Sequence, residues 1–187
     1  MNRVGILVGA KGRGSNMRSL IEACRRGVVP NAEIAVVVAP SEAAPALEVA
    51  RAMGVATQVA PNEAGPLLRS FADCEAICLA GFLRLLPAEV LAAFPDRVLN
   101  IHPALLPKFG GKGMYGMHVH AAVVAAGERE SGCTVHLVNE QYDEGRILLQ
   151  MRCRVYPSDS AEDVAARVLK LEHIAYPAAL AGVLDGG

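Results

Sequence analysis

Residues 4–16 read Val-Gly-Ile-Leu-Val-Gly-Ala-Lys-Gly-Arg-Gly-Ser-Asn, an apolar run followed by a glycine-rich turn. The run at 4–8 predicts a strand, and the amphipathic pattern over 17–26, closed by Gly27, predicts a helix directly after the turn. The same alternation of short apolar runs and helical patterns continues along the chain. It is typical of an α/β fold, and the opening stretch predicts its first strand–turn–helix unit.

Working outward from this unit, further apolar runs predict strands at 33–38, 56–59, 76–80, 98–101, 134–138 and 147–155. Helices are predicted at 43–53, 66–71, 88–94 and 120–126, and a loop rich in Pro, Gly and Lys at 103–117. A last helix begins after Ser160, and Asp163 completes a capping-box pattern. The chain shows neither an internal repeat nor a linker, so we expect one domain over residues 1–187.

Composition excludes several classes of function. The 187 residues are 52% hydrophobic, with a mean hydropathy of +0.30, yet no apolar run approaches the roughly 18 residues that span a bilayer. A net charge of −1 argues against a nucleic-acid surface. The first residues lead straight into a strand without a signal-peptide pattern. The five cysteines are scattered and form no CxxC motif, so we expect mostly buried free thiols and a cytoplasmic protein.

The stretch 98–107, Val-Leu-Asn-Ile-His-Pro-Ala-Leu-Leu-Pro, carries the strongest chemical signal. Asn100 and His102 are two apart at the end of a predicted strand, so both side chains face the same side. An amide and an imidazole at one spot can polarise a carbonyl and exchange a proton near neutral pH. The alternative is a strand end that is merely polar.

The turn at 9–16 predicts a phosphate site, because glycines admit a ligand to the backbone and a helix N-terminus offers free N–H groups. Lys11 and Arg13 add positive charge. The turn lacks the Lys-Ser/Thr ending of a nucleotide-hydrolase loop and the third glycine of a dinucleotide fingerprint. The predicted second strand ends without the carboxylate that a dehydrogenase needs for ribose. The alternative is an ordinary turn in which Ser15 caps the helix.

The turn Tyr-Asp-Glu-Gly at 142–145 lies between two predicted strands. If Asp143 folded back onto His102, its charge would orient the imidazole and stabilise the cationic form. The alternative is a turn without a function. His118 and His120 form an HxH pair, and with His102 and His136 there are enough imidazoles for zinc. No Cys or carboxylate stands at the usual ligand spacing, so we predict no metal site.

Four motifs resemble the folate-dependent formyltransferases: Gly-Ser-Asn at 14–16, Ala-Gly-Phe-Leu-Arg-Leu-Leu at 80–86, Asn-Ile-His-Pro-Ala-Leu-Leu-Pro at 100–107 and Asp-Glu-Gly at 143–145. The resemblance runs from residue 4 to about residue 180. It is closest to the members that act on glycinamide ribonucleotide, whose 5′-phosphate suits the turn at 14–16. Methionyl-tRNA formyltransferases and formyltetrahydrofolate hydrolases resemble the same domain but carry an additional one.

The resemblance implies a three-layer α/β/α fold with a Rossmann-like, mostly parallel, seven-stranded sheet. It also implies three sets of site residues. The catalytic set is Asn100, His102 and Asp143. The substrate-binding set is Gly14, Ser15, Asn16 and Glu172. The folate-binding set is Arg84, Leu85, Leu86, Glu140, Gln141, Tyr142 and Glu144.

The activity that the resemblance implies is formyl transfer from 10-formyltetrahydrofolate, a co-substrate, to the amine of glycinamide ribonucleotide in purine biosynthesis. Asn100 and a protonated His102 would donate hydrogen bonds to the developing oxyanion, while Asp143 would hold His102. The partners would be these small molecules, without nucleic acid or membrane, and a homodimer is compatible with this interpretation. The alternatives are another folate-dependent formyltransferase, a formyltetrahydrofolate hydrolase, and a non-catalytic phosphosugar-binding domain.

Two segments depart from the family pattern. The first loop is longer, owing to Ala10 and Lys11, and residues 110–117 look inserted relative to shorter members. Arg146 also stands where many members have proline. These departures put the shape of the phosphate seat and the conformation of the 110–117 segment in question.

Overall fold

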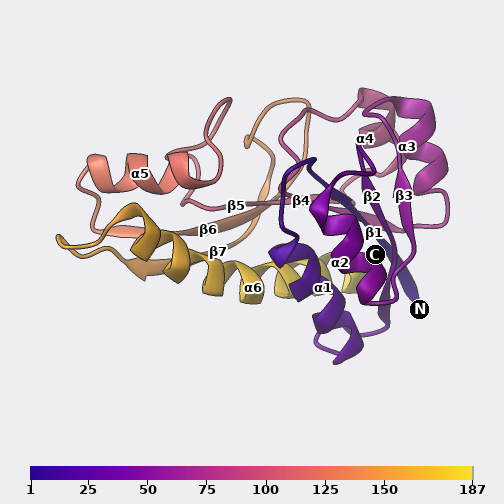
Figure 1. Cartoon of the computed structure of the whole chain (residues 1–187), viewed down its shortest axis with the longest axis horizontal. Helices are drawn as coiled ribbons and strands as arrows, with labels where there is room; N and C mark the ends of the chain where they lie inside the picture. The colour runs from indigo at the N-terminus through magenta and orange to yellow at the C-terminus, as the bar shows by residue number, and fades with distance from the viewer. Residues whose placement is uncertain (187) are drawn as a thin grey trace.

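A computed structural model describes residues 1–186 and contains one seven-stranded sheet in the order β3-β2-β1-β4-β5-β6-β7 (Figure 1). The strands are β1 (Asn2–Val8), β2 (Ala32–Ala39), β3 (Thr57–Val59), β4 (Ala76–Ala80), β5 (Val98–His102), β6 (Glu130–Leu137) and β7 (Ile147–Arg154). All neighbouring pairs from β3 to β5 are parallel, whereas β6 runs antiparallel to both β5 and β7. The predicted α/β fold with a mostly parallel seven-stranded sheet is confirmed.

The strand order reverses between β1 and β4. The chain moves outward from β1 through β2 to β3, then returns to place β4 on the other side of β1. Loops at the carboxyl ends of strands diverge at such a reversal and leave a crevice where ligands bind. Gly9 and Gly81 follow β1 and β4 at this point, and a Cβ on Gly9 would collide with the Gly81 carbonyl oxygen. Glycine is therefore required where the two strand ends meet.

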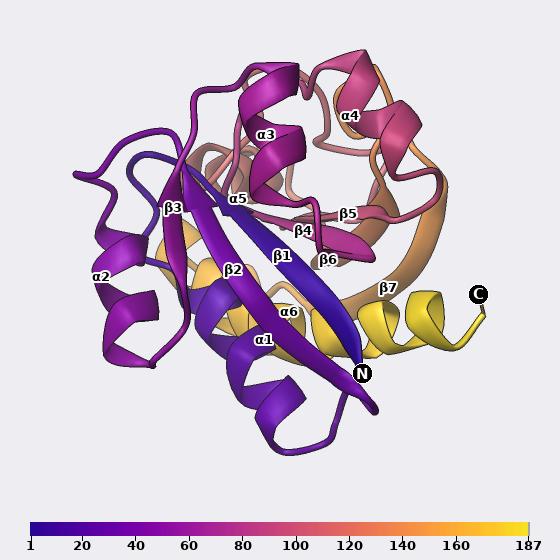
Figure 2. The same cartoon turned by 90° about the vertical axis from the view of Figure 1, so that its right-hand side faces the viewer.

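Helices cover both faces of the sheet (Figure 2). One face carries α1 (Ser15–Arg25), α2 (Pro45–Ala52) and α6 (Ala161–Asp185), and the other carries α3 (Ala64–Ser70) and α4 (Ala88–Ala93). Two separate apolar clusters form the cores beneath these layers. The remaining helix, α5 (Met117–Ala125), packs against α6.

Helix α6 is fixed to the centre of the sheet by Tyr176. This residue is fully buried, and its hydroxyl donates toward the carbonyl oxygens of Leu79 at 2.7 Å and Leu99 at 3.0 Å. It thereby ties the helix to both β4 and β5. At the start of α6, Ser160 and Asp163 form the predicted capping box, which is confirmed. The capping box fixes where the helix begins, and Tyr176 fixes the body of the helix against β4 and β5.

Several expected details were wrong. Strand β6 begins at Glu130, four residues before the predicted start, because its polar first half is paired with β7 and not marked by an apolar run. Helix α5 begins at Met117, three residues early. The alternative interpretation, in which Ser15 caps α1, does not hold: Gly14 is the cap residue, with φ 77°, and no side-chain cap bond forms. The Ser15 hydroxyl is therefore not used by the helix.

The cysteines are free, as expected, and Cys24, Cys78 and Cys133 are buried. Burial raises the pKa of the Cys24 thiol to about 11 and that of Cys133 to about 12. Such thiols are protonated and poor nucleophiles at neutral pH. Within residues 1–186, the structure has no helix that is both long enough and apolar enough to cross a membrane.

Candidate active site

A cavity of about 570 Å³ opens at the carboxyl ends of β1, β4 and β5. Its walls come from segments far apart in the sequence: the 81–85 segment after β4, the 111–117 loop, the 141–143 turn and one side of α6. The cavity lies at the reversal of strand order, where a ligand site is expected in an open α/β sheet.

Asn100 and His102 line one wall of this cavity from β5. In the register with β6, Asn100 lies opposite His136 and His102 lies opposite Thr134. Beyond His102, the Thr134 hydroxyl donates to the Ala104 carbonyl oxygen at 2.6 Å and accepts from the Leu106 amide at 3.1 Å. The predicted common facing of the two side chains is observed, and Thr134 fixes the backbone that follows them.

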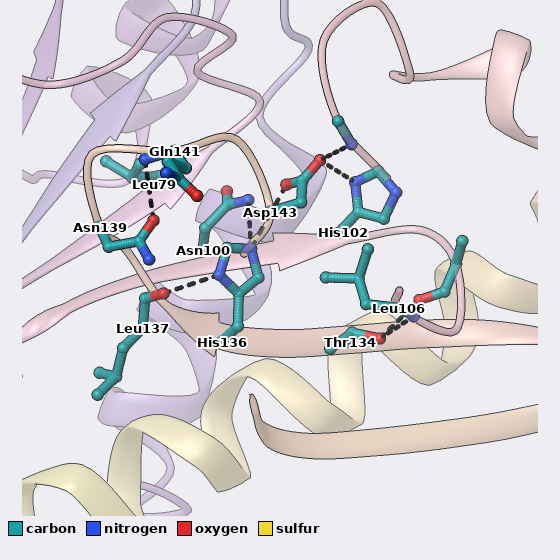
Figure 3. A network of polar contacts seen from close by, with 12 residues as sticks. Leu79, Asn100, His102, Leu106, Thr134, His136, Leu137, Asn139, Gln141 and Asp143 are labelled. Atoms are coloured by element: carbon teal, nitrogen blue, oxygen red, sulfur yellow. Dashed lines mark hydrogen bonds and ion pairs between the residues drawn. The ribbon is translucent and has the colours of Figure 1, made fainter. Parts of the chain in front are cut away.

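Asp143 folds back onto β5 and places its carboxylate between two imidazoles (Figure 3). Its Oδ2 atom lies 3.5 Å from His102 Nδ1 and accepts a hydrogen bond from the Gly111 amide at 2.9 Å. Its Oδ1 atom lies 3.5 Å from His136 Nε2. Asp143 has a φ of 58°, a left-handed conformation that Asp tolerates better than most residues. This conformation, at the turn between β6 and β7, lets a residue distant in sequence reach His102.

The charges in this cluster are set by burial and by the neighbours. Burial lowers the pKa of His102 below its ordinary value and outweighs the opposing pull of Asp143. Burial by itself would raise the pKa of Asp143, but bonds and charges from His136, His102 and Gly111 outweigh it and lower that pKa. Both shifts favour an ionised carboxylate beside a neutral imidazole in the free site. The protonated His102 that was expected during the reaction is opposed in the free site by desolvation, which disfavours the imidazolium.

His102 Nε2 lies 2.7 Å from the carbonyl oxygen of Phe109, and a neutral ring donates its proton there. The lone pair is then on Nδ1, the nitrogen that faces Asp143. Phe109 has a φ of 56°, which is unusual for a bulky side chain and typical of backbone held in place at functional sites. Asp143 and Phe109 thus face the two ring nitrogens of His102, and Nδ1 carries the lone pair that can take up a proton.

His136, which the sequence singled out only as a candidate zinc ligand, is a residue of the site. Its Nε2 atom lies 3.2 Å from Asn100 Nδ2 and 3.5 Å from Asp143 Oδ1, so the ring lies beside both the amide and the carboxylate. Its Nδ1 atom contacts the Leu137 carbonyl oxygen at 2.8 Å. The alternation along 134–138 places Thr134 and His136 on one face, but the β5–β6 register was needed to bring them to Asn100 and His102.

The α1–α6 end of the cavity holds Ser15, Asn16 and Glu172 of the predicted substrate-binding set, whereas Gly14 is not among the lining residues. Asn16 Nδ2 donates to Glu172 Oε2 at 2.7 Å, while Asn16 Oδ1 is buried without a hydrogen-bond partner among residues 1–186. Burial raises the pKa of Glu172, and the bond from Asn16 opposes it. Ser15 is exposed in the first turn of α1, beside amides that have no partner within the helix. The Arg13 side chain also lines the cavity.

Only part of the predicted folate-binding set lines the cavity. Leu83 and Leu85 are 53% and 38% exposed and form an apolar wall with Arg84. Leu86 is 6% exposed and packs in the hydrophobic core, so its side chain does not line the cavity. Of the folate-binding residues in the turn between β6 and β7, Gln141 and Tyr142 line the cavity. Glu140 and Glu144 are exposed and are not among the lining residues, because the turn directs them to solvent.

The 110–117 segment closes one side of the cavity. Gly111, Gly113 and Gly116 adopt positive φ angles, which let the chain curl so that Met114 and Tyr115 line the cavity. The two histidines that follow are separated. His118 is exposed and stacks on Tyr115 with ring centroids 5.3 Å apart, whereas His120 is buried in the cavity wall. Within residues 1–186, no three His, Cys, Asp or Glu side chains form a group that could hold a metal.

Comparison with known proteins agrees with this geometry. Residues 4–180 match the formyl transferase family. The chain is 42% identical over 186 residues to the chloroplastic phosphoribosylglycinamide formyltransferase of Arabidopsis thaliana, covering 93% of this chain and 63% of the relative. It is 34% identical to the phosphoribosylglycinamide formyltransferase of Escherichia coli K12, covering 98% of this chain and 88% of that protein. The chain spans less than two thirds of the length of the plant relatives, at 63% and 59%.

Solved structures give the same result. The phosphoribosylglycinamide formyltransferase of Brucella melitensis superposes with a TM-score of 0.84 at 42% identity, covering 97% of this chain and 94% of that one. Glycinamide ribonucleotide transformylase 1 of Symbiobacterium toebii superposes with a TM-score of 0.87 at 36% identity, covering 100% and 89%. With a family match over most of its length and a cavity built from the motifs at 14–16, 100–107 and 143–145, the chain belongs to the formyl transferase family.

Proposed function

We propose that this protein transfers the formyl group of 10-formyltetrahydrofolate to the amine of glycinamide ribonucleotide. The observation that carries the proposal is the cluster of Asn100, His102, His136 and Asp143 at the wall of one cavity. A binding module has no need of a carboxylate that reaches across the sheet to a buried imidazole. Relatives that match most of this chain are named phosphoribosylglycinamide formyltransferases, and these names support the same substrate pair.

The two ends of the cavity suit the two substrates. Ser15 and Asn16 present free N–H groups at the start of α1, and a helix N-terminus attracts a phosphate. Glu172 is held nearby by Asn16 and accepts hydrogen bonds, as ribose hydroxyls require. At the other end, Leu83 and Leu85 offer an exposed apolar wall for a flat heterocycle. The reacting groups then meet at Asn100 and His102.

In the proposed reaction, Asn100 donates a hydrogen bond to the formyl oxygen as negative charge develops on it. His102 begins neutral, and its Nδ1 atom receives the proton that the attacking amine releases. Asp143 then faces a cationic imidazole 3.5 Å away and stabilises it. The imidazolium passes its proton to the departing folate nitrogen. One N–C bond forms and one breaks, and His102 returns to its neutral form.

The decisive experiment is an assay with 10-formyltetrahydrofolate, with and without glycinamide ribonucleotide. Loss of the formyl group only in the presence of the amine supports a transferase. Loss without the amine indicates a hydrolase, and no loss in either case favours a phosphosugar-binding domain. The free cysteines favour a reducing compartment, and we propose that the reaction takes place in the cytoplasm.

A further inference from the structure

His120 is a cavity residue to which neither the family motifs nor the proposed reaction gives a role. It lies in the first turn of α5, is 5% exposed and lines the cavity. Its Nδ1 atom is buried and has no hydrogen-bond partner within residues 1–186. Buried polar atoms in folded proteins nearly always have a partner, so each exception calls for an explanation. A partner supplied by a bound ligand explains a nitrogen left unpaired in the wall of a ligand cavity.

The charge state of His120 defines what this partner can be. Burial lowers the pKa of His120, and the neighbouring His102 lowers it further. The ring is therefore neutral near pH 7, and a neutral imidazole has one nitrogen that accepts a hydrogen bond. Rotation about the bond between Cβ and the ring is a soft motion, so this nitrogen can turn toward a ligand. The missing partner is an N–H or O–H donor.

The position of His120 indicates which substrate carries that donor. His120 and His102 line the same cavity, and they are near enough for His102 to lower the pKa of His120. Its helix, α5, packs on α6, the helix that brings Glu172 to the phosphate end of the cavity. In the proposed reaction the two substrates meet beside His102, where the formyl group carries no N–H or O–H and the acceptor carries an amine, so the donor comes from the acceptor substrate.

We propose that His120 accepts a hydrogen bond from the amine-bearing end of the acceptor substrate and holds the nucleophilic nitrogen beside His102. The ligand class is a primary amine next to a carboxamide, whose N–H groups are the donors nearest the reacting centre. This inference rests on the proposed function and adds a positioning contact for the acceptor alone. The other histidine of the HxH pair, His118, is exposed and stacked on Tyr115, and it provides a matched control.

The first test uses the wild-type protein labelled with ¹⁵N in its histidine rings. Glycinamide ribonucleotide is added without folate, so that no turnover occurs, and calorimetry on the same sample establishes occupancy. The His120 Nδ1 resonance, assigned by its loss in His120→Asn, is expected to shift as the site fills, while the His118 resonances stay in place. An unmoved His120 resonance in the saturated protein overturns the inference.

The second test compares His120→Leu, His120→Asn and His118→Leu. Loss of one hydrogen bond predicts a rise of up to about tenfold in the Kd of glycinamide ribonucleotide for His120→Leu. The Kd of the folate substrate should not change. Asn keeps an acceptor near the position of Nδ1 and should restore most of the affinity, and His118→Leu should behave as wild type. Equal weakening of both ligands would show a merely structural role and overturn the inference.

The two proposals fail separately. Wild-type formyl transfer to glycinamide ribonucleotide, together with an unchanged His120 resonance, overturns the role of His120 and leaves the proposed function standing. Wild-type protein that fails to transfer the formyl group overturns the proposed function itself. The labelled wild-type experiment decides the role of His120 even if the His120→Leu protein does not fold.

Discussion

Replacing Asp143 by Asn tests the charge that we assign to the cluster. The change keeps the shape of the side chain and an oxygen that can accept from the Gly111 amide, but it removes the negative charge beside His102. Two unit charges 3.5 Å apart attract by about 5 kcal/mol at an effective dielectric constant of about 20. The imidazolium is only partly formed in the transition state, so about 3–4 kcal/mol is lost. Because each 1.36 kcal/mol is tenfold, turnover should fall by about 10²–10³.

The same substitution has a defined effect on titration. The carboxylate opposes the effect of burial on His102, so its removal should lower the pKa of His102 still further below the ordinary value. An NMR titration of the His102 ring in both proteins measures this shift, and initial rates at saturating substrates measure turnover. Asp96→Asn is the control, because its side chain is 78% exposed and lies 3.9 Å from Arg146 at the surface. Wild-type turnover in folded Asp143→Asn, or an unchanged His102 titration, would refute the reasoning.

Three further predictions concern other parts of the site and the core. In His102→Ala, turnover should fall about 10²–10³-fold with little change in the Kd of the acceptor, and wild-type turnover in the folded variant would exclude the proposed chemistry. In Ser15→Ala, the KM for glycinamide ribonucleotide should rise more than kcat falls, as is typical of lost ground-state binding; equal affinity for a dephosphorylated acceptor would show that the loop is only a turn. Tyr176→Phe removes the hydroxyl bonded to the carbonyls of Leu79 and Leu99, at a cost of about 1–3 kcal/mol. At about 2–4 °C per kcal/mol for a chain of this size, calorimetry should show a Tm lower by at least about 2 °C, and an unchanged Tm would contradict the anchoring role.

Many of the elements followed from local patterns. The apolar runs of β1, β4 and β5 are short and continuous because these strands are buried on both faces of the sheet, and such runs can be recognised without knowing their neighbours. The capping box of Ser160 and Asp163 is likewise a contact between near neighbours in sequence. The start of β6 was missed because its first residues are held by pairing with β7 and not marked by an apolar run. The cap of α1 is the left-handed Gly14, which uses no side-chain bond.

The candidate site divides in the same way. The sequence by itself determined that Asn100 and His102 face the same side, because side chains alternate along a strand. Only the tertiary structure brought Asp143 within 3.5 Å of His102, set His136 against Asn100, separated His118 from His120 and turned Leu86 into the core. It also lowered the pKa of His102, because burial depends on everything packed around the ring. The periodicity of side chains and the capping of helices depend on residues that are close in sequence. Strand register, side-chain burial and the pKa of a buried group are set by segments that meet only when the chain is folded.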